Sequence, residues 1–241
     1  MKKQEKINKK NFLFLILLFF LTSLISLITF KKVNIQNIRI SGSKLFSQNE
    51  LVNNSSLKFP IRLIFINTKF LERELKQNLT LKNVSVVRQI FPFGLKIQLE
   101  TRIPIAYGER ILNNEKILGF IDKDGIFIEK QNVDEKILDK LTIQVFGWEE
   151  KYKKTLSEIL KSQENYEFEL VKIIFSPSGF LTIEEKDLKT ILLGFNPNLI
   201  KYQLQIINNL KIEFKKYNLN EKIDNIDLTD PQKPKIKVFK P

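Results

Sequence analysis

Residues 33–51 read VNIQNIRISGSKLFSQNEL and contain the signals of a strand, a turn and the start of a helix. Ile38 and Ile40 alternate with polar residues, as expected for a strand with one buried face. The apolar residues before them alternate in the opposite phase. This slip at Gln36-Asn37 predicts either a bulge or a strand that begins near Asn37. A folded unit therefore starts here, directly after a long apolar run.

The turn Ser41-Gly42-Ser43 is followed by the signature of a helix N-terminus. Ser47 fits the N-cap position, and Glu50 stands three residues later, where it can complete a capping box. Phe46 and Leu51 occupy the two positions of a hydrophobic staple around this start. Because the three signals agree, the sequence predicts a short helix here.

A second helix and two strands follow, and they complete a small domain. Either Asn67 or Thr68 can cap the helix. Its predicted apolar face consists of Phe70, Leu71, Leu75 and Leu79. Residues 84–88 and 95–99 have the pattern of strands, with a Pro- and Gly-containing turn between them. The order β-α-α-β-β over residues 33–103 predicts a two-layer α+β domain whose helices cover one sheet face.

The apolar run before this domain covers residues 11–30 and contains no charged residue. As a helix it would be about 30 Å long, which matches the hydrocarbon core of a bilayer. Lysines flank both ends, and the run lacks the small-residue cleavage site of a signal peptide, which is the alternative. The sequence predicts an uncleaved transmembrane helix, with residues 1–10 as a cytoplasmic tail and residues 33–241 outside the cytoplasm.

The composition argues against several classes of function. The 241-residue chain has no cysteine and no histidine, so it lacks thiol chemistry, disulfides and the commonest general base and metal ligand. The formal charge is +13, but 34 lysines stand against six arginines and are spread along the chain. We therefore expect no nucleic-acid partner, no cofactor, no metal and no small-molecule substrate.

Residues 107–241 are predicted to form a second domain built around a mixed or antiparallel sheet with covering helices. Strands are expected up to Lys130, with a tight turn at Asp124-Gly125. A calcium loop starting at Asp122 is excluded because its later ligand positions fall on apolar residues. A helix is expected over residues 150–162. Its apolar face is Tyr152, Leu156, Ile159 and Leu160, and three strands follow at residues 168–175, 179–184 and 189–193.

A long helix is predicted to start at Asn196-Pro197, with Asn as the cap and Pro at the first helical position. Its expected buried stripe is Leu199, Tyr202, Ile206, Leu210 and Phe214. A partner-binding face is the alternative interpretation of this stripe. The chain then continues with I-D-x-I-D-L from Ile223 to Leu228 and with a short amphipathic strand over residues 235–239.

These features together resemble the bacterial cell-division family FtsQ/DivIB. The resemblance rests on a β-α-α-β-β unit, a POTRA domain in that family, directly after one anchor. It also rests on V-S-V-V-R, L-K-I-Q-L-E and P-I-A over residues 84–106, and on the order of motifs from Leu192 to Leu228. The chain departs from the family pattern by an extra residue around 91–94. It also has Thr229 where the family usually has arginine, which puts the role of that arginine in doubt here.

The resemblance implies a non-enzymatic, single-pass scaffold of the plasma membrane at the division septum. Its implied partners are small membrane proteins of the FtsB and FtsL type, bound when a C-terminal edge strand accepts a partner strand. The implied partner-binding residues are Thr229, Lys235, Ile236, Lys237, Val238 and Phe239. Alternating residues of the last strand face opposite sides, and we expect one of the two sets to pack on the domain.

Two alternatives belong to other classes of protein. Ser41, Ser43 and Lys44 follow the anchor at a distance similar to that in membrane-tethered Ser–Lys hydrolases, but the sequence lacks the second motif that carries the lysine in those enzymes. A POTRA-containing component of a membrane transport or assembly system is the other alternative. Such proteins usually have several POTRA units or a barrel, for which this chain is too short.

Overall fold

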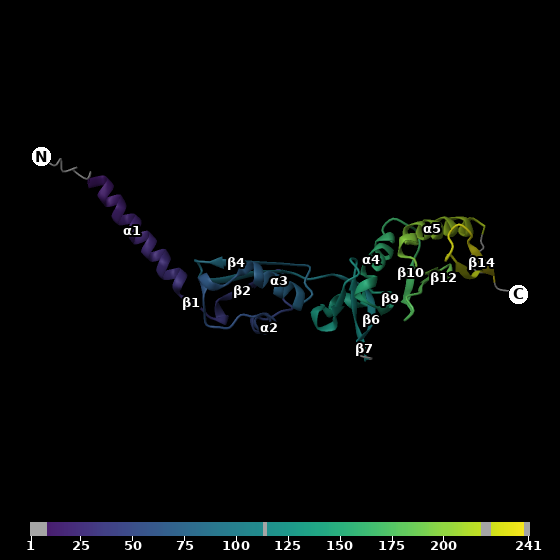
Figure 1. The fold of residues 1–241 in the computed structure, drawn as a ribbon, viewed down its shortest axis with the longest axis horizontal. Coiled ribbons are helices and arrows are strands. Elements are labelled where there is room, and N and C mark those ends of the chain that lie inside the picture. Colours follow the sequence, from purple (N-terminus) through teal and green to yellow (C-terminus); the bar gives the residue numbers. More distant parts are fainter. Residues whose placement is uncertain (1–8, 113–114, 218–222, 239–241) are drawn as a thin grey trace. The chain divides into compact units, whose positions relative to one another are not determined.

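The computed structural model describes residues 9–112, 115–217 and 223–238 (Figure 1). The chain separates into unit 1, Met1–Thr101, and unit 2, Arg102–Pro241. Each unit has its own buried core.

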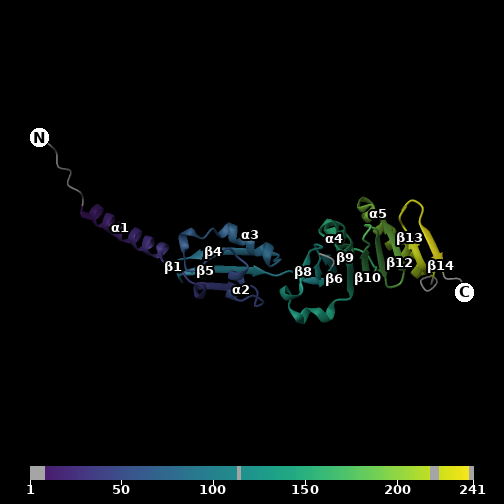
Figure 2. The same cartoon turned by 60° about the horizontal axis from the view of Figure 1, so that its bottom comes forward.

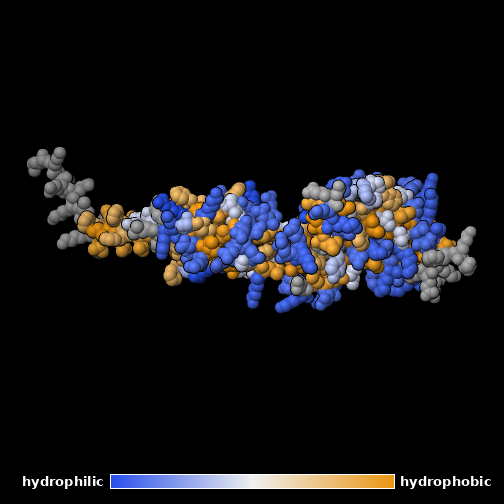
Figure 3. Space-filling view, turned by 90° about the horizontal axis from the view of Figure 1, so that it is seen from below, coloured by the Kyte–Doolittle hydropathy of each residue, from blue (hydrophilic) through white to orange (hydrophobic). Residues whose placement is uncertain are grey.

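The first element is the helix α1 (Lys9–Phe30), which contains the apolar run. Its large side chains from Phe12 to Ile25 are exposed on all sides, and they form the orange surface of this helix in Figure 3. Among the described residues, no helix combines the length and the apolar character that crossing a membrane requires. The transmembrane part of the predicted fold therefore stays a prediction.

Unit 1 contains the predicted β-α-α-β-β order, with a few short elements added. After α1 its elements are β1 (Lys32–Val33), the 3-10 turn η1 (Ile35–Asn37), β2 (Ile38–Ser41), α2 (Gln48–Asn53), β3 (Ile61–Arg62), the 3-10 turn η2 (Leu63–Phe65), α3 (Thr68–Asn78), β4 (Asn83–Gln89) and β5 (Gly94–Glu100). Three strands form a sheet in the order β2-β5-β4, with β2 parallel and β4 antiparallel to β5. One face packs on α2 and α3, and the other bears exposed polar residues of β5.

The opening stretch folds as its sequence signals predict. The phase slip is a 3-10 turn, after which the strand begins at Ile38, so the second of the two interpretations is confirmed. Ser47 Oγ accepts the Glu50 N–H at 3.2 Å, and the Glu50 carboxylate accepts the Ser47 N–H at 2.6 Å. The bond that the Ser47 N–H donates, followed by the interaction of the Ser47 side chain with the same carboxylate, holds the pKa of Glu50 below its ordinary value. The predicted capping box is therefore confirmed.

The apolar face predicted for α3 is right except at its first residue. Asn67 is the N-cap, and its side chain accepts the Phe70 N–H at 3.1 Å. Leu71, Leu75 and Leu79 are buried, but Phe70 is 48% exposed. The prediction was wrong there because the buried residues follow an i, i+4, i+8 row, and Phe70 lies about 100° around the helix from it.

Unit 2 is built on one large sheet. Its elements are β6 (Pro104–Leu112), β7 (Glu115–Asp122), β8 (Phe127–Glu129), η3 (Lys130–Asn132), η4 (Glu135–Lys140), β9 (Ile143–Trp148), η5 (Glu150–Tyr152), α4 (Lys153–Ser162), β10 (Leu170–Phe175), β11 (Leu181–Glu185), β12 (Lys189–Gly194), η6 (Pro197–Leu199), α5 (Ile200–Lys216), β13 (Ile223–Asp227) and β14 (Lys235–Val238). Over the described residues the strand order is β14-β13-β12-β11-β10-β9-β6-β7-β8.

Three parallel pairs interrupt this otherwise antiparallel sheet: β6 with β9, β9 with β10, and β12 with β13. Parallel neighbours need a long crossover connection, which α4 makes between β9 and β10 and α5 makes between β12 and β13. Both helices lie on the same side of the sheet (Figures 1 and 2), where their apolar residues share one core with the strands. The sequence analysis missed β9, so it missed the first of these crossovers.

The Asp122–Gly125 turn joins β7 to the segment before β8. One oxygen of the Asp122 carboxylate accepts the N–H groups of Asp124 and Ile126, and the other binds Arg102 at 2.6 Å. Gly125 has φ of +73°, a conformation that glycine adopts without steric cost. The predicted tight turn is therefore present, and the Asp122 carboxylate is used in holding it.

The buried stripe predicted for α5 is wrong. The buried residues of this helix are Ile200, Gln203, Leu204, Ile207 and Lys211. The predicted stripe is half-buried beside them, except for Tyr202, which is exposed. The error arose because the real face includes two polar residues, which a search for apolar periodicity passes over.

Lys211 can be buried because it has two carboxylate partners. Its ammonium group lies 2.6 Å from Glu185 and 2.8 Å from Asp187. Burial by itself would lower the pKa of Lys211, but the hydrogen bonds to Asp187 and Glu185 outweigh it and raise that pKa. The bond to Lys211 likewise lowers the pKa of Asp187. Lys211 and Asp187 therefore both stay charged at neutral pH.

Gln203, on the same face of α5, binds backbone carbonyls instead of carboxylates. Its side-chain Nε2 donates to the carbonyl of Leu193 at 2.8 Å and to that of Leu228 at 2.7 Å. These carbonyls lie at the ends of β12 and β13, and Gln203 is fully buried. One amide group therefore ties the crossover helix to both strands of a parallel pair.

We predict that Gln203→Leu lowers the free energy of unfolding by about 1–3 kcal/mol, because two buried carbonyls lose their donor while the side-chain volume is nearly kept. Chemical denaturation of the purified chain measures this change. The control is Gln205→Leu on the exposed side of the same helix, which should stay within about 0.5 kcal/mol of wild type. Equal effects of the two substitutions would contradict the role given to Gln203.

Candidate functional site

The strand β14 forms one end of the large sheet (Figure 2). It pairs antiparallel with β13, with Ile236 opposite Ile226 and Lys235 opposite Asp227. Over the described residues its other side has no neighbouring strand. An edge of this kind presents unpaired N–H and C=O groups, which are a template for one further strand.

All four side chains of β14 are exposed. Ile236 is 42% and Val238 55% exposed, so the expectation that one set packs on the domain is wrong. The reason lies in the reach of the helical layer. The core under α5 includes Ile223, Ile226 and Leu228 but no described residue of β14. The strand is therefore held by backbone pairing with β13, and both of its faces remain accessible.

The charges of β14 are partly matched by its neighbour β13. Lys237 Nζ lies 3.1 Å from the Asp224 carboxylate, and Lys237 remains largely exposed. Lys235 stands opposite Asp227 in the strand register. Exposed pairs of this kind are worth little, since water and salt screen them. Both ammonium groups are therefore available to an incoming acidic residue.

Thr229 lies just after β13, where the chain turns toward β14. Its hydroxyl donates to Asp227 Oδ1 at 2.6 Å, and its backbone N–H donates to the same oxygen at 3.0 Å. The hydroxyl bond, then the backbone bond, lowers the pKa of Asp227, and the charge of Lys235 adds a smaller effect. Thr229 therefore closes the turn and keeps a carboxylate charged beside the edge strand.

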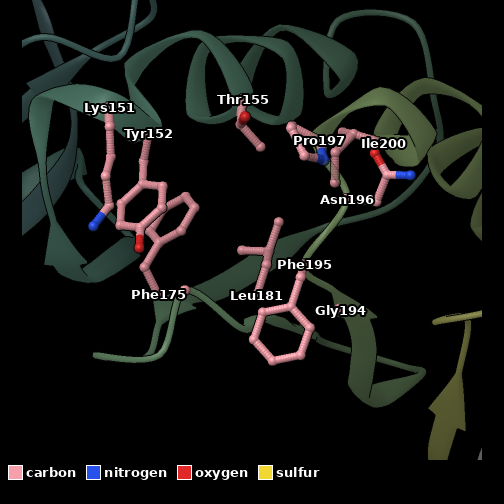
Figure 4. Close-up of a pocket in the computed structure, with 11 residues that line it drawn as sticks. Lys151, Tyr152, Thr155, Phe175, Leu181, Gly194, Phe195, Asn196, Pro197 and Ile200 are labelled. Carbon is pink, nitrogen blue, oxygen red and sulfur yellow. The ribbon is translucent and has the colours of Figure 1, made fainter.

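A pocket of about 160 Å³ opens on the helical side of unit 2, between the N-terminal ends of α4 and α5 (Figure 4). Tyr152 and Phe175 stack at 4.4 Å between ring centroids and form one wall. Leu181, Phe195 and Ile200 supply further apolar surface. The Tyr152 hydroxyl is buried and has no hydrogen-bond partner in the described part of the chain. The pocket can therefore accept an apolar side chain that also carries a polar atom.

The pocket adjoins the turn that precedes β14. Gly194 lines the pocket and has φ of +87°. A Cβ atom at Gly194 would lie 3.2 Å from the Thr229 methyl carbon, so the two residues are in close contact. The end of β12, the pocket and the start of the β13–β14 turn consequently form one continuous region of unit 2.

The structure describes five of the six predicted partner-binding residues. Lys235, Ile236, Lys237 and Val238 form β14, and Thr229 lies in the turn before it. Phe239 lies outside the described residues. The sequence analysis missed Gln203 and the pocket aromatics Tyr152, Phe175 and Phe195 as parts of this region. No motif marks them, since each comes from a different element and is brought in by the fold.

The residues of the Ser–Lys hypothesis serve as a turn. Ser41 ends β2, and the Ser43 hydroxyl accepts the Leu45 N–H at 3.2 Å. Gly42 has φ of +91°, and a Cβ there would collide with the Leu99 carbonyl. Local backbone geometry thus accounts for Ser-Gly-Ser.

Comparison with known proteins assigns unit 1 to a domain family. The family described as "POTRA domain, FtsQ-type" matches residues 33–102. A cell division protein DivIB of Clostridium acetobutylicum is 28% identical over 109 residues, which are 45% of this chain and 42% of that protein. The match therefore spans less than half of the relative's length.

The β-α-α-β-β unit, its sheet order and this match identify residues 33–102 as a POTRA domain of the FtsQ type. Together with the DivIB relative, they support the similarity of the chain to the FtsQ/DivIB family of cell division proteins. The resemblance noted in the sequence is thereby confirmed.

We predict that Thr229→Val raises the pKa of Asp227 toward the ordinary value of about 3.9, because the largest stabilising hydrogen bond is lost. A lowered pKa stabilises the fold above the unfolded-state value, and this contribution is lost as the pH falls through the folded-state pKa. The stability difference between variant and wild type should accordingly vanish in strong acid. NMR titration of the Asp227 carboxyl carbon measures the shift. Lys235→Met should shift it less, and a larger shift would contradict this assignment.

Proposed function

We propose that this chain is a membrane-anchored scaffold of the bacterial division machinery that binds partner proteins through the edge strand β14. The observation that carries the proposal is the open edge of β14, with both faces accessible, in a chain that contains an FtsQ-type POTRA domain and is similar to a DivIB protein. A scaffold needs a surface that recognises another chain, and an unpaired strand edge is such a surface.

Binding would occur by addition of a partner strand to β14. Backbone N–H and C=O groups would supply the affinity, and alternate side chains would supply the selectivity. Ile236 and Val238 offer apolar contacts on one face. Lys235 and Lys237 on the other face favour a strand with acidic residues. The same lysines discourage pairing of two β14 strands, which would bring like charges together.

The partners that we propose are small membrane proteins of the FtsB and FtsL type, recruited to the division septum. The support is the similarity to the DivIB relative, which is a cell division protein by name, and the FtsQ-type POTRA match. We further propose that residues 33–103 and 107–241 act as the two domains of this scaffold, with the second carrying the partner site.

We also propose that α1 anchors the chain in the plasma membrane, with residues 1–10 in the cytoplasm and residues 33–241 outside. The support is the uncharged run of residues 11–30, its helical conformation and the exposure of its described apolar side chains in all directions. Water would solvate such a surface poorly, whereas hydrocarbon suits it.

The edge is tested by placing proline at successive positions of β14. In an antiparallel pair, alternate residues direct their N–H groups toward the neighbour and toward the open side. Of Ile236→Pro and Lys237→Pro, one should therefore disturb the β13 pairing, and the other should leave the domain folded but abolish binding. Binding of the chain to purified FtsB-type segments is measured by calorimetry, with circular dichroism as the check on folding.

Charge reversal at Lys235 and Lys237 is the second arm of the same experiment. It should weaken binding of an acidic partner more at low salt than at high salt, because salt screens exposed charges. Undiminished binding by the proline variant whose domain stays folded would move the interface away from β14. In that case the POTRA unit would be the next surface to examine.

We predict that protease added to intact spheroplasts degrades residues 33–241, because the anchor leaves them outside the cytoplasm. The mature chain should also keep its N-terminal residues, as expected for an uncleaved anchor. Immunoblotting with an N-terminal tag and mass spectrometry of the purified protein make the two measurements. Full protection of the large fragment would contradict the orientation, and a mature N-terminus near Lys31 would contradict the anchor.

A further inference from the structure

Two segments of unit 1 carry large apolar side chains that the domain core leaves exposed. They are residues 62–65, which contain η2, and residues 88–93, which comprise the end of β4 and the turn to β5. We call these two segments the tip. Phe91 is 95% and Phe65 is 65% exposed, and Ile64 and Ile90 are each more than two-fifths exposed. Single exposed apolar residues need no explanation, but a group of this size marks an interaction surface.

The two segments of the tip are tied together by Arg88. Its guanidinium donates through Nε at 3.1 Å and through Nη2 at 2.7 Å to the carbonyl of Ile66. Arg88 lies near the end of β4, and Ile66 directly follows η2. The exposed side chains on both sides of this bond consequently belong to one surface.

The chain itself holds the tip next to the end of α1. The strand β1 follows α1 after a single residue, and Lys32 pairs with Arg62 of β3. The turn η2 follows β3 directly and contacts α1, and Lys31 Nζ lies 5.3 Å from the centre of the Phe93 ring. Phe65 is three residues beyond Arg62, and three residues of chain span at most about 10 Å. Phe65 therefore stays within about 10 Å of the β1–β3 pair, whatever direction α1 takes.

The tip and the residues that leave α1 have charge of one sign. Residues 31–32, 62–65 and 88–93 contain four basic side chains and no carboxylate. The surface of unit 1 shows both blue and orange regions (Figure 3). Aromatic and aliphatic side chains interspersed with basic ones are the composition that binds an anionic membrane interface.

We propose that the tip inserts into the outer headgroup region of the bilayer in which α1 is anchored. The side chains of Phe65, Ile90 and Phe91 would lie at the boundary with the acyl chains, and the basic groups would contact lipid phosphates. This inference rests on the proposed anchoring by α1. The headgroup region begins where the helix ends, and interfacial side chains reach about 5–10 Å into it. Because the chain keeps Phe65 within about 10 Å of the β1–β3 pair that follows α1, the tip can reach this region.

A lipid surface fits these residues better than a protein partner does. The tip lies at the level where the membrane must begin, so any occupant competes with the headgroups themselves. Acidic lipid supplies phosphate to basic groups of the tip and acyl chains to the apolar ones. Insertion would give the POTRA unit a second point of attachment besides α1, which would limit its tilt on the membrane.

The test uses the full chain, reconstituted singly in nanodiscs that contain anionic phospholipid with or without bromine near the top of the acyl chains. Phe91→Trp and Phe65→Trp each introduce a probe at an exposed position. The wild-type chain, whose single tryptophan is Trp148, supplies the background. We expect both new tryptophans to lose emission in brominated discs and to emit at shorter wavelength than in the control variant.

The control is Asn83→Trp, which places an exposed probe at the opposite end of β4, about 20 Å from the turn. If the tip probes are quenched no more than this control in discs that contain the chain, the tip does not enter lipid and the surface serves a protein partner instead. If the chain does not co-elute with the discs, the anchor and the tip proposal both fail. Unchanged quenching in neutral lipid would overturn the role of the basic groups.

Discussion

The parallel pairing of β12 with β13 is the constraint on which the C-terminal half of unit 2 depends. Parallel neighbours cannot be joined by a hairpin, so the chain must cross the sheet, and α5 makes that crossing. The helix covers one sheet face, and Gln203 fixes both strand ends to it through two carbonyls. β14 in turn depends on β13 for its pairing. The edge strand is therefore paired with a strand whose end a buried amide ties to the crossover helix.

The sequence predicted those elements whose signals are local. The capping box at Ser47, the cap at Asn67 and the turn at Asp124-Gly125 each need a few neighbouring residues, and each is present as expected. The sequence did not predict β9, because its parallel partners β6 and β10 are distant in the chain and no hairpin turn announces it. The face of α5 was missed because Gln203 and Lys211 are polar, and their burial depends on partners in other elements.

The sequence predicted which strand forms the candidate site, but it did not predict which side chains of that strand are exposed. The motif order in the sequence, through the family resemblance, pointed to the last strand, and this strand does lie at the end of the sheet. The alternation in residues 235–238 suggested one packed face, yet the helical layer stops at β13 and leaves both faces accessible. Alternation of apolar and polar residues predicts a buried face only where another layer of the domain covers the strand. Whether a helix covers the last strand depends on the topology of the domain and cannot be read from the strand's own residues.

A strand of four residues is a weak binding site by itself. Half of its residues direct their two backbone groups outward, so a partner strand gains about four hydrogen bonds, each worth about 0.5–1.5 kcal/mol net. Association of two free proteins costs about 4–15 kcal/mol in lost freedom, which backbone pairing alone does not offset. Side-chain contacts with Ile236 and Val238 add to the pairing. If both partners are anchored in one membrane, their effective concentration rises and much of that cost is already met. In the proposed mechanism the anchor and the short edge strand would therefore act together, because the membrane would make a weak edge sufficient.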